Sequence, residues 1–329
     1  MSLRLIAAIT LAATLLSTWS CSAPSHDSNS SEKAGIHRFD ISVSGYENLD
    51  STSRVEFLDS FQSVANILVR DLQANPDSAL SAYAQSDAVQ LFTPDIKARY
   101  RYQDSIEGVL GQVKAGMGRL LPGVTWPEIY AIVSPYNQAV ILSDSIMLIG
   151  LNHYLGTDYE AYDYFDTYLR KTKTPRHQPY DIAEALIATQ YPYSPGDSPT
   201  LLSRMLYEGA LLHAIEAVMP HFSLGEAIGY TDDELDRAQR IEGQAWKNMI
   251  DKGLLFSSSP HTIDRIVRQA PSTAILHPDA PGRMGRYIGY MIVNDYLDRF
   301  PSTTPEQLLT RSFYNSSSTL VKSGFNPTH

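Results

Sequence analysis

The sequence predicts an α+β fold, a mostly helical single domain with a small sheet. Three observations support this prediction. Apolar residues between Phe57 and Leu72 recur every three or four positions, which is the pattern of an amphipathic helix. Residues 128–134 and 138–151 are rich in β-branched side chains, which favour strands. Helix-capping residues then follow through the C-terminal half, so helices are expected to dominate there.

The N-terminal elements are predicted from alternation and from capping residues. Polar and apolar residues alternate in residues 37–44, as in a strand with one buried face. Ser53 and Glu56 form a capping box ahead of the first amphipathic helix. Thr93, which a proline follows, is expected to cap a second long helix that ends near Leu121.

Turn and capping residues predict the later elements. Residues 135–137 (Pro-Tyr-Asn) are expected to form the turn between two neighbouring strands. In a long helix predicted over residues 283–300, Gly285 and Gly289 lie one turn apart, which predicts the close approach of another element. The other predicted helices begin at Ser198-Pro199, Thr231, Ser259-Pro260 and Thr304-Pro305. The helix from Ser198-Pro199 is expected to end at Met219, and the helix from Thr231 near Lys252.

The N-terminus has the pattern of a bacterial lipoprotein signal. Arg4 supplies a positive start, residues 5–16 form a short apolar run, and small residues lead to Cys21, the only cysteine. Cys21 is therefore predicted to carry a diacylglycerol and, on its freed amine, an acyl chain such as palmitate. The alternative is an ordinary secretory signal with Cys21 as a free thiol. Thr18 favours that alternative, because lipoprotein signals usually have leucine there.

The same interpretation divides the chain into three parts. Residues 1–20 are predicted to be a signal peptide. Residues 21–35 are predicted to be a flexible tether after the lipidated cysteine, because they are polar and rich in serine. Residues 36–329 are predicted to form the globular domain.

Charge and cysteine content exclude several classes of function. The formal net charge is −10, and it becomes −11 (−10 minus +1) when Arg4 is removed with the signal. An acidic body repels phosphate backbones, so no nucleic-acid partner is expected. A single cysteine also excludes a disulfide within the chain and a metal site built on several thiolates.

No pattern of a metal site or of a catalytic nucleophile is found. The nine histidines include no pair three or four residues apart, the spacing with which a helix presents two ligands to zinc. His213 and His221 are eight residues apart, with Pro220 between them. No G-x-S-x-G motif occurs. We therefore predict no metal, no cofactor and no catalytic residue.

Tyrosines are unusually frequent in residues 154–168, which contain five. Rings with a polar tip suit the recognition of sugars or peptides, and at helical spacing they equally suit the edge of a core. We favour the core edge, with a binding surface as the alternative.

Five segments, from the middle strands onward, share their order and motifs with one protein family. They are residues 141–155, 181–188, 201–209, 229–234 and, most specifically, 281–296 (PGRMGRYIGYMIVNDY). These segments resemble the GldB family of gliding-motility-associated lipoproteins from Bacteroidetes. The resemblance implies an exported lipoprotein of the cell envelope, more often on the outer membrane than the inner, without known catalytic activity.

A second resemblance, to zincin-like metallopeptidases, concerns the order of the same elements. In that family the first helix carries HExxH and the second helix carries a third ligand before a glycine. On this chain the HExxH position falls on residues 183–187 and the third ligand on Glu208. The resemblance implies that Glu184 keeps the position of the catalytic base, while Ala183 and Ile187 replace both histidines. It thus implies a zincin-like arrangement without a metal site.

Two interpretations of Glu184 and Glu208 stay open. They could be a vestigial polar pocket that binds a ligand or peptide. Alternatively, each is exposed or paired with an arginine such as Arg204, Arg283 or Arg286, since an unpaired carboxylate is costly in apolar surroundings.

The sequence thus predicts a membrane-tethered, non-catalytic lipoprotein that binds protein partners in envelope or gliding-type machinery. One alternative is an active or residual hydrolase on a metallopeptidase-like scaffold. Another is a surface lipoprotein that binds glycans or peptides. The oligomeric state and the identity of the partner do not follow from the sequence.

Overall fold

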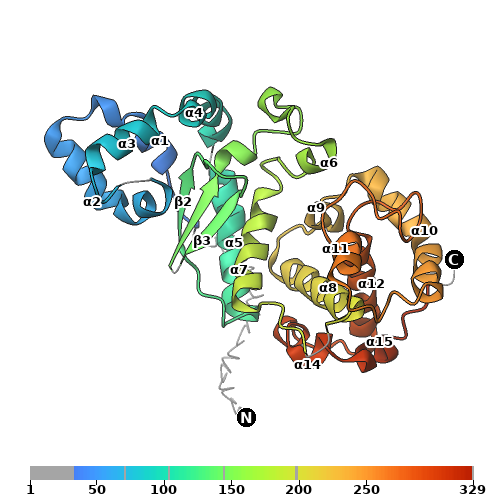
Figure 1. Cartoon of the computed structure of the whole chain (residues 1–329). Helices are drawn as coiled ribbons and strands as arrows, with labels where there is room; N and C mark the ends of the chain where they lie inside the picture. Colours follow the sequence, from blue (N-terminus) through green and yellow to red (C-terminus); the bar gives the residue numbers. More distant parts are fainter. Residues whose placement is uncertain (1–32, 70–71, 103, 144, 197–198, 328–329) are drawn as a thin grey trace, which may run out of the picture. The chain divides into compact units, whose positions relative to one another are not determined.

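The computed structural model describes residues 33–69, 72–102, 104–143, 145–196 and 199–327 (Figure 1). The predicted signal peptide, Cys21 and nearly all of the predicted tether lie outside these residues. The described residues are mostly helical and contain one four-stranded sheet, so the predicted α+β class is confirmed.

The strands are β1 (Ile36–His37), β2 (Glu128–Ile132), β3 (Val140–Ser143) and β4 (Ile146–Gly150). The helices are α1 (Phe39–Ser44), α2 (Ser51–Leu68), α3 (Pro76–Ala84), α4 (Asp87–Arg99), α5 (Asp104–Leu120), α6 (Thr167–Arg170), α7 (Gln178–Gln190), α8 (Leu201–Val218), α9 (Leu224–Ile228), α10 (Asp232–Asp251), α11 (Pro260–Val267), α12 (Met284–Arg299), α13 (Pro305–Leu308), α14 (Arg311–Tyr314) and α15 (Ser317–Ser323).

The sheet has the strand order β1-β2-β4-β3. β1 and β4 run parallel to β2, while β3 runs antiparallel to β4. Residues 138–151 were expected to form one strand beside β2, but they form the hairpin β3–β4, and its second strand lies next to β2. A run of this length exceeds the usual five or six residues of a strand, so it folds back on itself.

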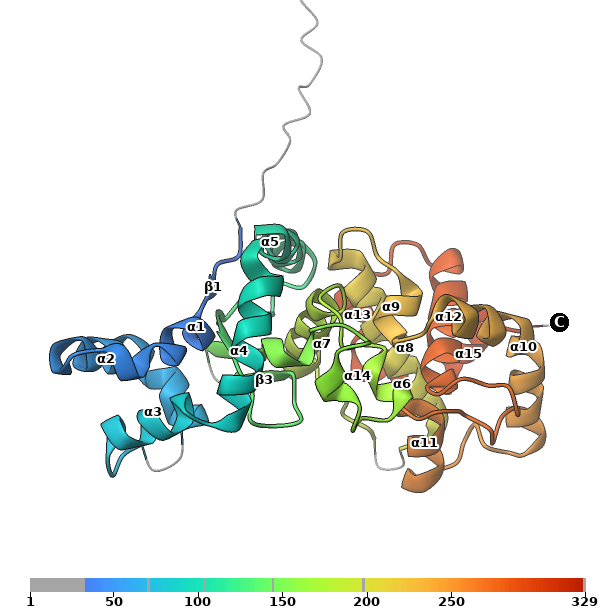
Figure 2. The same cartoon turned by 90° about the horizontal axis from the view of Figure 1, so that it is seen from above.

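The two faces of the sheet cover two separate cores. Ile132 and Leu148 face a small core that the helices α1 to α3 complete. Ile129 and Met147 face a larger core that contains α5, α7 and α8. Figure 2 shows these two groups of helices on opposite sides of the sheet region. Strands buried on both faces are apolar at nearly every position, which explains the apolar middle of the sequence.

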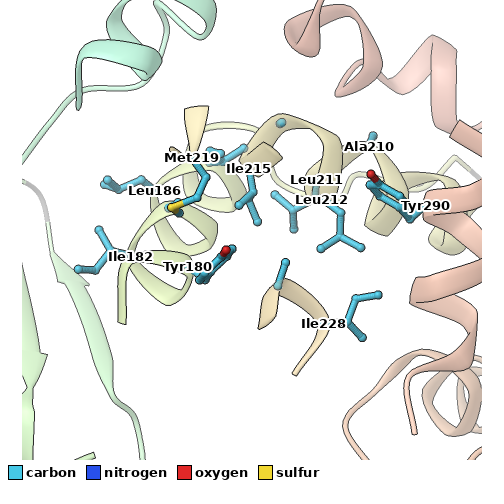
Figure 3. Close-up of a cluster of buried hydrophobic side chains, with 14 of the residues drawn as sticks. Tyr180, Ile182, Leu186, Ala210, Leu211, Leu212, Ile215, Met219, Ile228 and Tyr290 are labelled. Atoms are coloured by element: carbon cyan, nitrogen blue, oxygen red, sulfur yellow. The ribbon is translucent and has the colours of Figure 1, made fainter. Parts of the chain in front are cut away.

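Helix α8 is the centre of the larger core. Apart from Arg204, Glu216 and Ala217, every residue of α8 is buried, and a helix that is apolar on all sides is typical of a domain interior. Figure 3 shows Ile182 and Leu186 of α7 in the same apolar cluster as Ile215, near the C-terminal end of α8.

Helices α8 and α12 touch through glycines. A Cβ at Gly209 would lie 2.8 Å from the backbone nitrogen of Tyr290, and a Cβ at Gly289 would lie 2.8 Å from the carbonyl carbon of Met205. Both separations are too short for a real side chain. The close approach predicted at Gly289 is therefore confirmed, with α8 as the partner. At Gly285 the neighbour is α11, through Ile266.

Two N-terminal predictions are wrong. Of residues 37–44, only His37 lies in a strand, while residues 39–44 form α1, because Phe39 and Val43 lie one helical turn apart and are both fully buried. Thr93 does not start a helix, since Pro94 lies inside α4, which Ser86 caps. Proline removes its own N–H from the hydrogen-bond ladder and its ring crowds the carbonyl of residue i−4, but α4 continues past Pro94.

Capping residues predicted the other helices better. The first amphipathic helix begins three residues earlier than expected, because Asp50, and not Ser53, accepts the capping hydrogen bond. The helix starts predicted at Thr231, Ser259 and Thr304 are confirmed, and the structure adds that Thr231 and Thr304 each form a capping box. The remaining C-terminal helix, α8, is capped by Thr200; Ser198 lies outside the described residues.

Candidate functional site

The structure brings Glu184 and Glu208 to the same arginine. Glu184 lies on α7, Glu208 on α8 and Arg286 in the first turn of α12. Nη2 of Arg286 donates to Oε2 of Glu184 at 2.6 Å, and its Nε lies 3.5 Å from Oε2 of Glu208. Arg204, one helical turn before Glu208, approaches Oε1 of Glu208 at 2.5 Å. We call Glu184, Arg204, Glu208 and Arg286 the Arg286 cluster.

The Arg286 cluster is charge-balanced and largely buried. The side chains of Arg286 and Glu208 are 5% and 6% exposed, whereas Glu184 is 34% exposed and forms the edge toward solvent. Burial by itself would lower the pKa of Arg286, but the charges of Glu184 and Glu208 raise it above its ordinary value. The guanidinium therefore stays protonated and holds both carboxylates.

Aromatic rings fix the outer arginine of the cluster. The guanidinium of Arg204 lies over the ring of Tyr193, 4.9 Å from its centroid, and 5.6 Å from the centroid of Tyr207. Such stacking favours a planar guanidinium and orients it toward Glu208.

A second polar group begins one turn before Glu184 on α7. Asp181 accepts a 2.7 Å hydrogen bond from the hydroxyl of Tyr154 and lies 3.2 Å from Nε2 of His177. Burial would raise the pKa of Asp181, but His177, Tyr154 and the charge of Arg283 together lower it. Asp181 is thus a carboxylate with its partners already in place.

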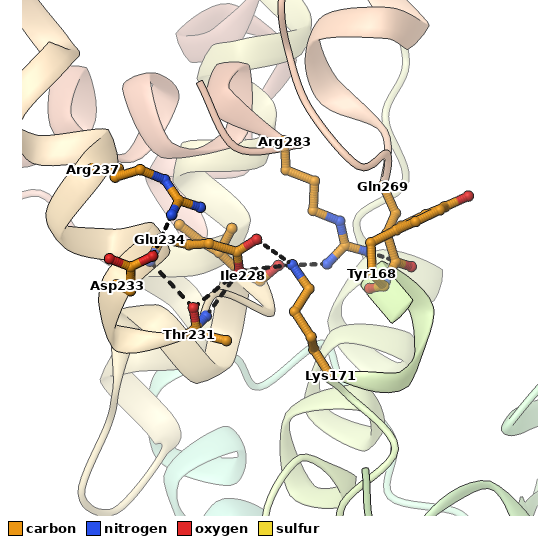
Figure 4. A network of polar contacts seen from close by, with 9 residues as sticks. All are labelled: Tyr168, Lys171, Ile228, Thr231, Asp233, Glu234, Arg237, Gln269 and Arg283. Atoms are coloured by element: carbon orange, nitrogen blue, oxygen red, sulfur yellow. Dashed lines mark hydrogen bonds and ion pairs between the residues drawn. The ribbon is translucent and has the colours of Figure 1, made fainter. Parts of the chain in front are cut away.

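Arg283 connects the start of α12 to three other segments. Its backbone is left-handed, with φ of 62°, a conformation that is uncommon outside glycine. Its guanidinium donates to the carbonyl of Ile228 at 2.6 Å and to Oε1 of Gln269 at 3.4 Å, and Gln269 in turn donates to the carbonyl of Tyr168 (Figure 4). The ion pair of Lys171 with Glu234 lies in the same network.

The sequence-predicted residues are thus placed together, and the simpler interpretation of them fits the contacts. Both glutamates are paired with arginines that the sequence interpretation named. Ala183 and Ile187, at the positions of the expected histidine ligands, are fully buried. Within the described residues, no group of three or more His, Cys, Asp or Glu is arranged to hold a metal ion. Whether the cluster is a vestigial pocket stays a prediction.

The tyrosine-rich segment is divided between core and surface. Tyr154 and Tyr162 are buried, and the hydroxyl of Tyr162 donates to the carbonyl of Asn152. Tyr164, in contrast, is 72% exposed and its ring packs on Phe165. The core-edge interpretation holds for the buried pair.

Sequence reasoning missed the group around Asp181 and the role of Arg283. His177 and Asp181 are spaced i, i+4, which is a local signal for a pair on one helix face. The partners of Arg283 are 14 or more residues away along the chain, so no local pattern shows them.

Comparison with protein families gives a match over residues 21–327 to the family described as gliding motility protein GldB. The chain belongs to the GldB family. The segment 281–296, which carried the resemblance most specifically, is the part that supplies Arg283, Arg286 and Gly289 to the contacts above. No curated protein and no solved structure matches the chain, and the zincin resemblance has no support from the comparisons. Among the described residues of this GldB-family chain, no helix is long and apolar enough to span a bilayer.

Proposed function

We propose that this GldB-family protein is a lipoprotein tethered through Cys21 to a membrane of the cell envelope. We further propose that it is not a catalyst but a partner-binding component of envelope or gliding-type machinery. We place it on the outer membrane in preference to the inner one. The family match, which begins at residue 21, supports the anchoring.

Chain geometry is compatible with this anchoring. Each methylene of an acyl chain adds about 0.8 kcal/mol of membrane affinity, so several chains on Cys21 would hold the protein firmly. The folded body begins near Ala34, whose backbone N–H donates to the carbonyl of Glu107. The residues between Cys21 and Ala34 span at most about 45 Å when fully extended. The body could therefore stand clear of the lipid surface and reach a partner.

The observation that carries the non-catalytic proposal is the position of Arg286 against both glutamates. A general base needs a free lone pair directed at substrate or water, and Oε2 of Glu184 is already occupied by the buried guanidinium of Arg286 at 2.6 Å. A dication placed between Glu184 and Glu208 would also be repelled by the charge of Arg286. The paired carboxylates therefore favour a structural role over hydrolysis.

An exposed strand edge supports partner binding. β3 is the last strand of the sheet, and all four of its residues are partly exposed. Its apolar residues Val140, Ile141 and Leu142 pack against the two cores and keep part of their surface exposed. An apolar edge strand is a template for an added strand from another chain.

One set of measurements separates this proposal from the hydrolase alternative. The purified body should contain no stoichiometric zinc, its melting temperature should not change with EDTA, and it should not cleave generic peptides. Cross-linking of the acylated protein in native envelope should capture one or more envelope proteins in defined proportion. One zinc per chain together with peptide cleavage would overturn the non-catalytic proposal, and a strictly unpartnered protein in the envelope would overturn the partner-binding proposal.

A further inference from the structure

A pocket at the N-terminal end of α7 has the composition of a ligand site. Its volume is about 380 Å³, within the range of sites for small molecules. The end of α4, helix α5, the start of α7 and the turn after α8 all contribute to its walls. Three stretches of the chain, within residues 99–109, 175–180 and 219–226, thus converge on one space.

The walls of this pocket are mostly apolar, and the donors of Tyr100 and Arg176 are already taken by partners within the fold. Ile106, Val109 and Met219 supply aliphatic surface. Pro175, Pro179 and Pro220 supply further wall, and proline has no backbone N–H to offer. A ligand rich in amides would leave polar groups without hydrogen bonds against these walls, and each such group would reduce the free energy of binding. An alkyl chain has no polar groups and would not incur this loss.

One positive charge at the pocket has no partner. Arg176 is neutralised by Glu226, which it approaches at 2.8 Å. Arg99, in contrast, forms no hydrogen bond or ion pair with any residue that the structure describes, and its side chain packs against Gly156, where an added Cβ would lie 3.3 Å from Nη2. Arg99 is thus an exposed arginine that lines a mostly apolar pocket and has no anion of its own among the described residues.

The backbone at the pocket is also unusual. His221 has φ of 56°, and it and Arg283 are the two non-glycine residues with positive φ in the described part of the chain. Arg283 is explained by its contacts within the fold. His221 is exposed and lines the pocket, so its strained conformation is found where a ligand would enter.

We infer that this pocket binds an unbranched alkyl carboxylate, that is, a fatty acid. The alkyl chain would lie against the aliphatic and proline walls, and the carboxylate would accept hydrogen bonds from Arg99, a geometry that guanidinium favours. Long-range electrostatic attraction does not explain the binding of a carboxylate, because the chain carries a net charge of −10 and repels anions at long range. The inference is independent of the function proposed above.

The test uses residues 21–329 with Cys21→Ser, which cannot be acylated and so needs no detergent that would compete for the pocket. Sodium decanoate, below its micelle concentration, is titrated calorimetrically into this protein, into its Arg99→Gln variant and into its Arg101→Gln variant. Arg101 is exposed and does not line the pocket, so it is the matched control. Decan-1-ol replaces decanoate in a parallel series.

Decanoate should bind at one site per chain, and Arg99→Gln should weaken it at least tenfold, since a charge-assisted hydrogen bond is lost. Arg101→Gln should change the affinity for decanoate less than twofold. Decanol should bind weakly to the unsubstituted chain and equally weakly to Arg99→Gln, with the affinity that decanoate has for Arg99→Gln. Equal melting temperatures of the two variants would exclude a folding defect.

Three results would overturn the inference. They are the absence of saturable decanoate binding, equal losses in the two arginine variants, and equal affinities for decanoate and decanol. A trileucine peptide with a free carboxylate is included as a competing occupant. If it binds in an Arg99-dependent way while decanoate does not, the pocket takes a peptide C-terminus and the fatty-acid assignment is wrong.

Discussion

Alanine at Gly289 is expected to destabilise the protein more than one added methyl group suggests. The new Cβ on α12 would lie 2.8 Å from the carbonyl carbon of Met205 on α8, and the carbonyl oxygen would be closer still. The obstacle is backbone, so no change of side-chain rotamer relieves it. The two helices would have to move apart, although α8 is enclosed by core on nearly all sides.

The magnitude follows from two opposing effects. Overpacking a core costs about 1–3 kcal/mol, and a backbone obstacle places Gly289→Ala near the upper end. Replacing glycine by alanine inside a helix returns about 1 kcal/mol. A net loss of about 2 kcal/mol remains, which corresponds to a melting temperature lower by roughly 4–8 °C for a domain of a few hundred residues.

The assay is denaturant and thermal unfolding of Gly289→Ala beside a matched control. Gly118 lies on α5, and a Cβ there would meet no atom within 4 Å. Gly118→Ala should therefore gain up to about 1 kcal/mol from helix propensity alone. If Gly289→Ala is as stable as the unsubstituted protein, the close contact of α8 with α12 is refuted. If Gly118→Ala loses as much, the loss at Gly289 has another origin.

Three further predictions concern the anchor, the cluster and pH. Cys21→Ala should release the protein from membranes or block its processing, as fractionation and apparent size would show; unchanged membrane retention and size would contradict lipidation. Arg286→Met should destabilise the protein by about 3–5 kcal/mol, because Glu208 would keep a buried charge with only Arg204 beside it. The double variant Arg286→Met/Glu208→Gln should recover part of that loss. If it recovers none, the energetic coupling of Arg286 with Glu208 is contradicted. Burial, followed by the charge of Lys173, lowers the pKa of His153 in the folded protein to about 4. As pH falls, His153 is therefore protonated in the unfolded chain before it is protonated in the folded protein. Stability should therefore decline from about pH 6.5 to about pH 4, and His153→Gln should flatten the decline; an equally steep profile in the variant would assign the decline to other groups.

Local signals account for the parts of the fold that the sequence predicts well. The box of Thr231 with Glu234 closes within four residues, and α10 begins where this box indicates. Such signals mislead where tertiary packing decides between two local patterns. Residues 37–44 have alternation that suits a strand, yet Phe39 and Val43 also fit one helix face, and the core of α2 and α3 selects the helix.

The candidate site shows the same division between local and distant information. Arg204 and Glu208 are spaced i, i+4, so their pair is visible on a helical projection. The pair of Glu184 with Arg286 joins residues 102 positions apart. The sequence offered three arginines as partners for the glutamates, and only the packing of α7 against α8 and of α8 against α12 selects among them.

The segment that opens α12 explains how so many charges are tolerated in the interior. Arg283 and Arg286 are three residues apart, and burial together with the charge of Arg286 lowers the pKa of Arg283. Glu184, Glu208 and Asp181 oppose this effect. With Arg204, three cations therefore face three carboxylates. A balanced group of this kind adds little net stability, because desolvation offsets the attraction, but removing one member leaves a buried charge uncompensated. The left-handed turn at Arg283 directs its guanidinium to Ile228, while Arg286 remains for the two glutamates. We expect this arrangement to contribute to the conformational specificity of the α7–α8–α12 packing more than to its free energy.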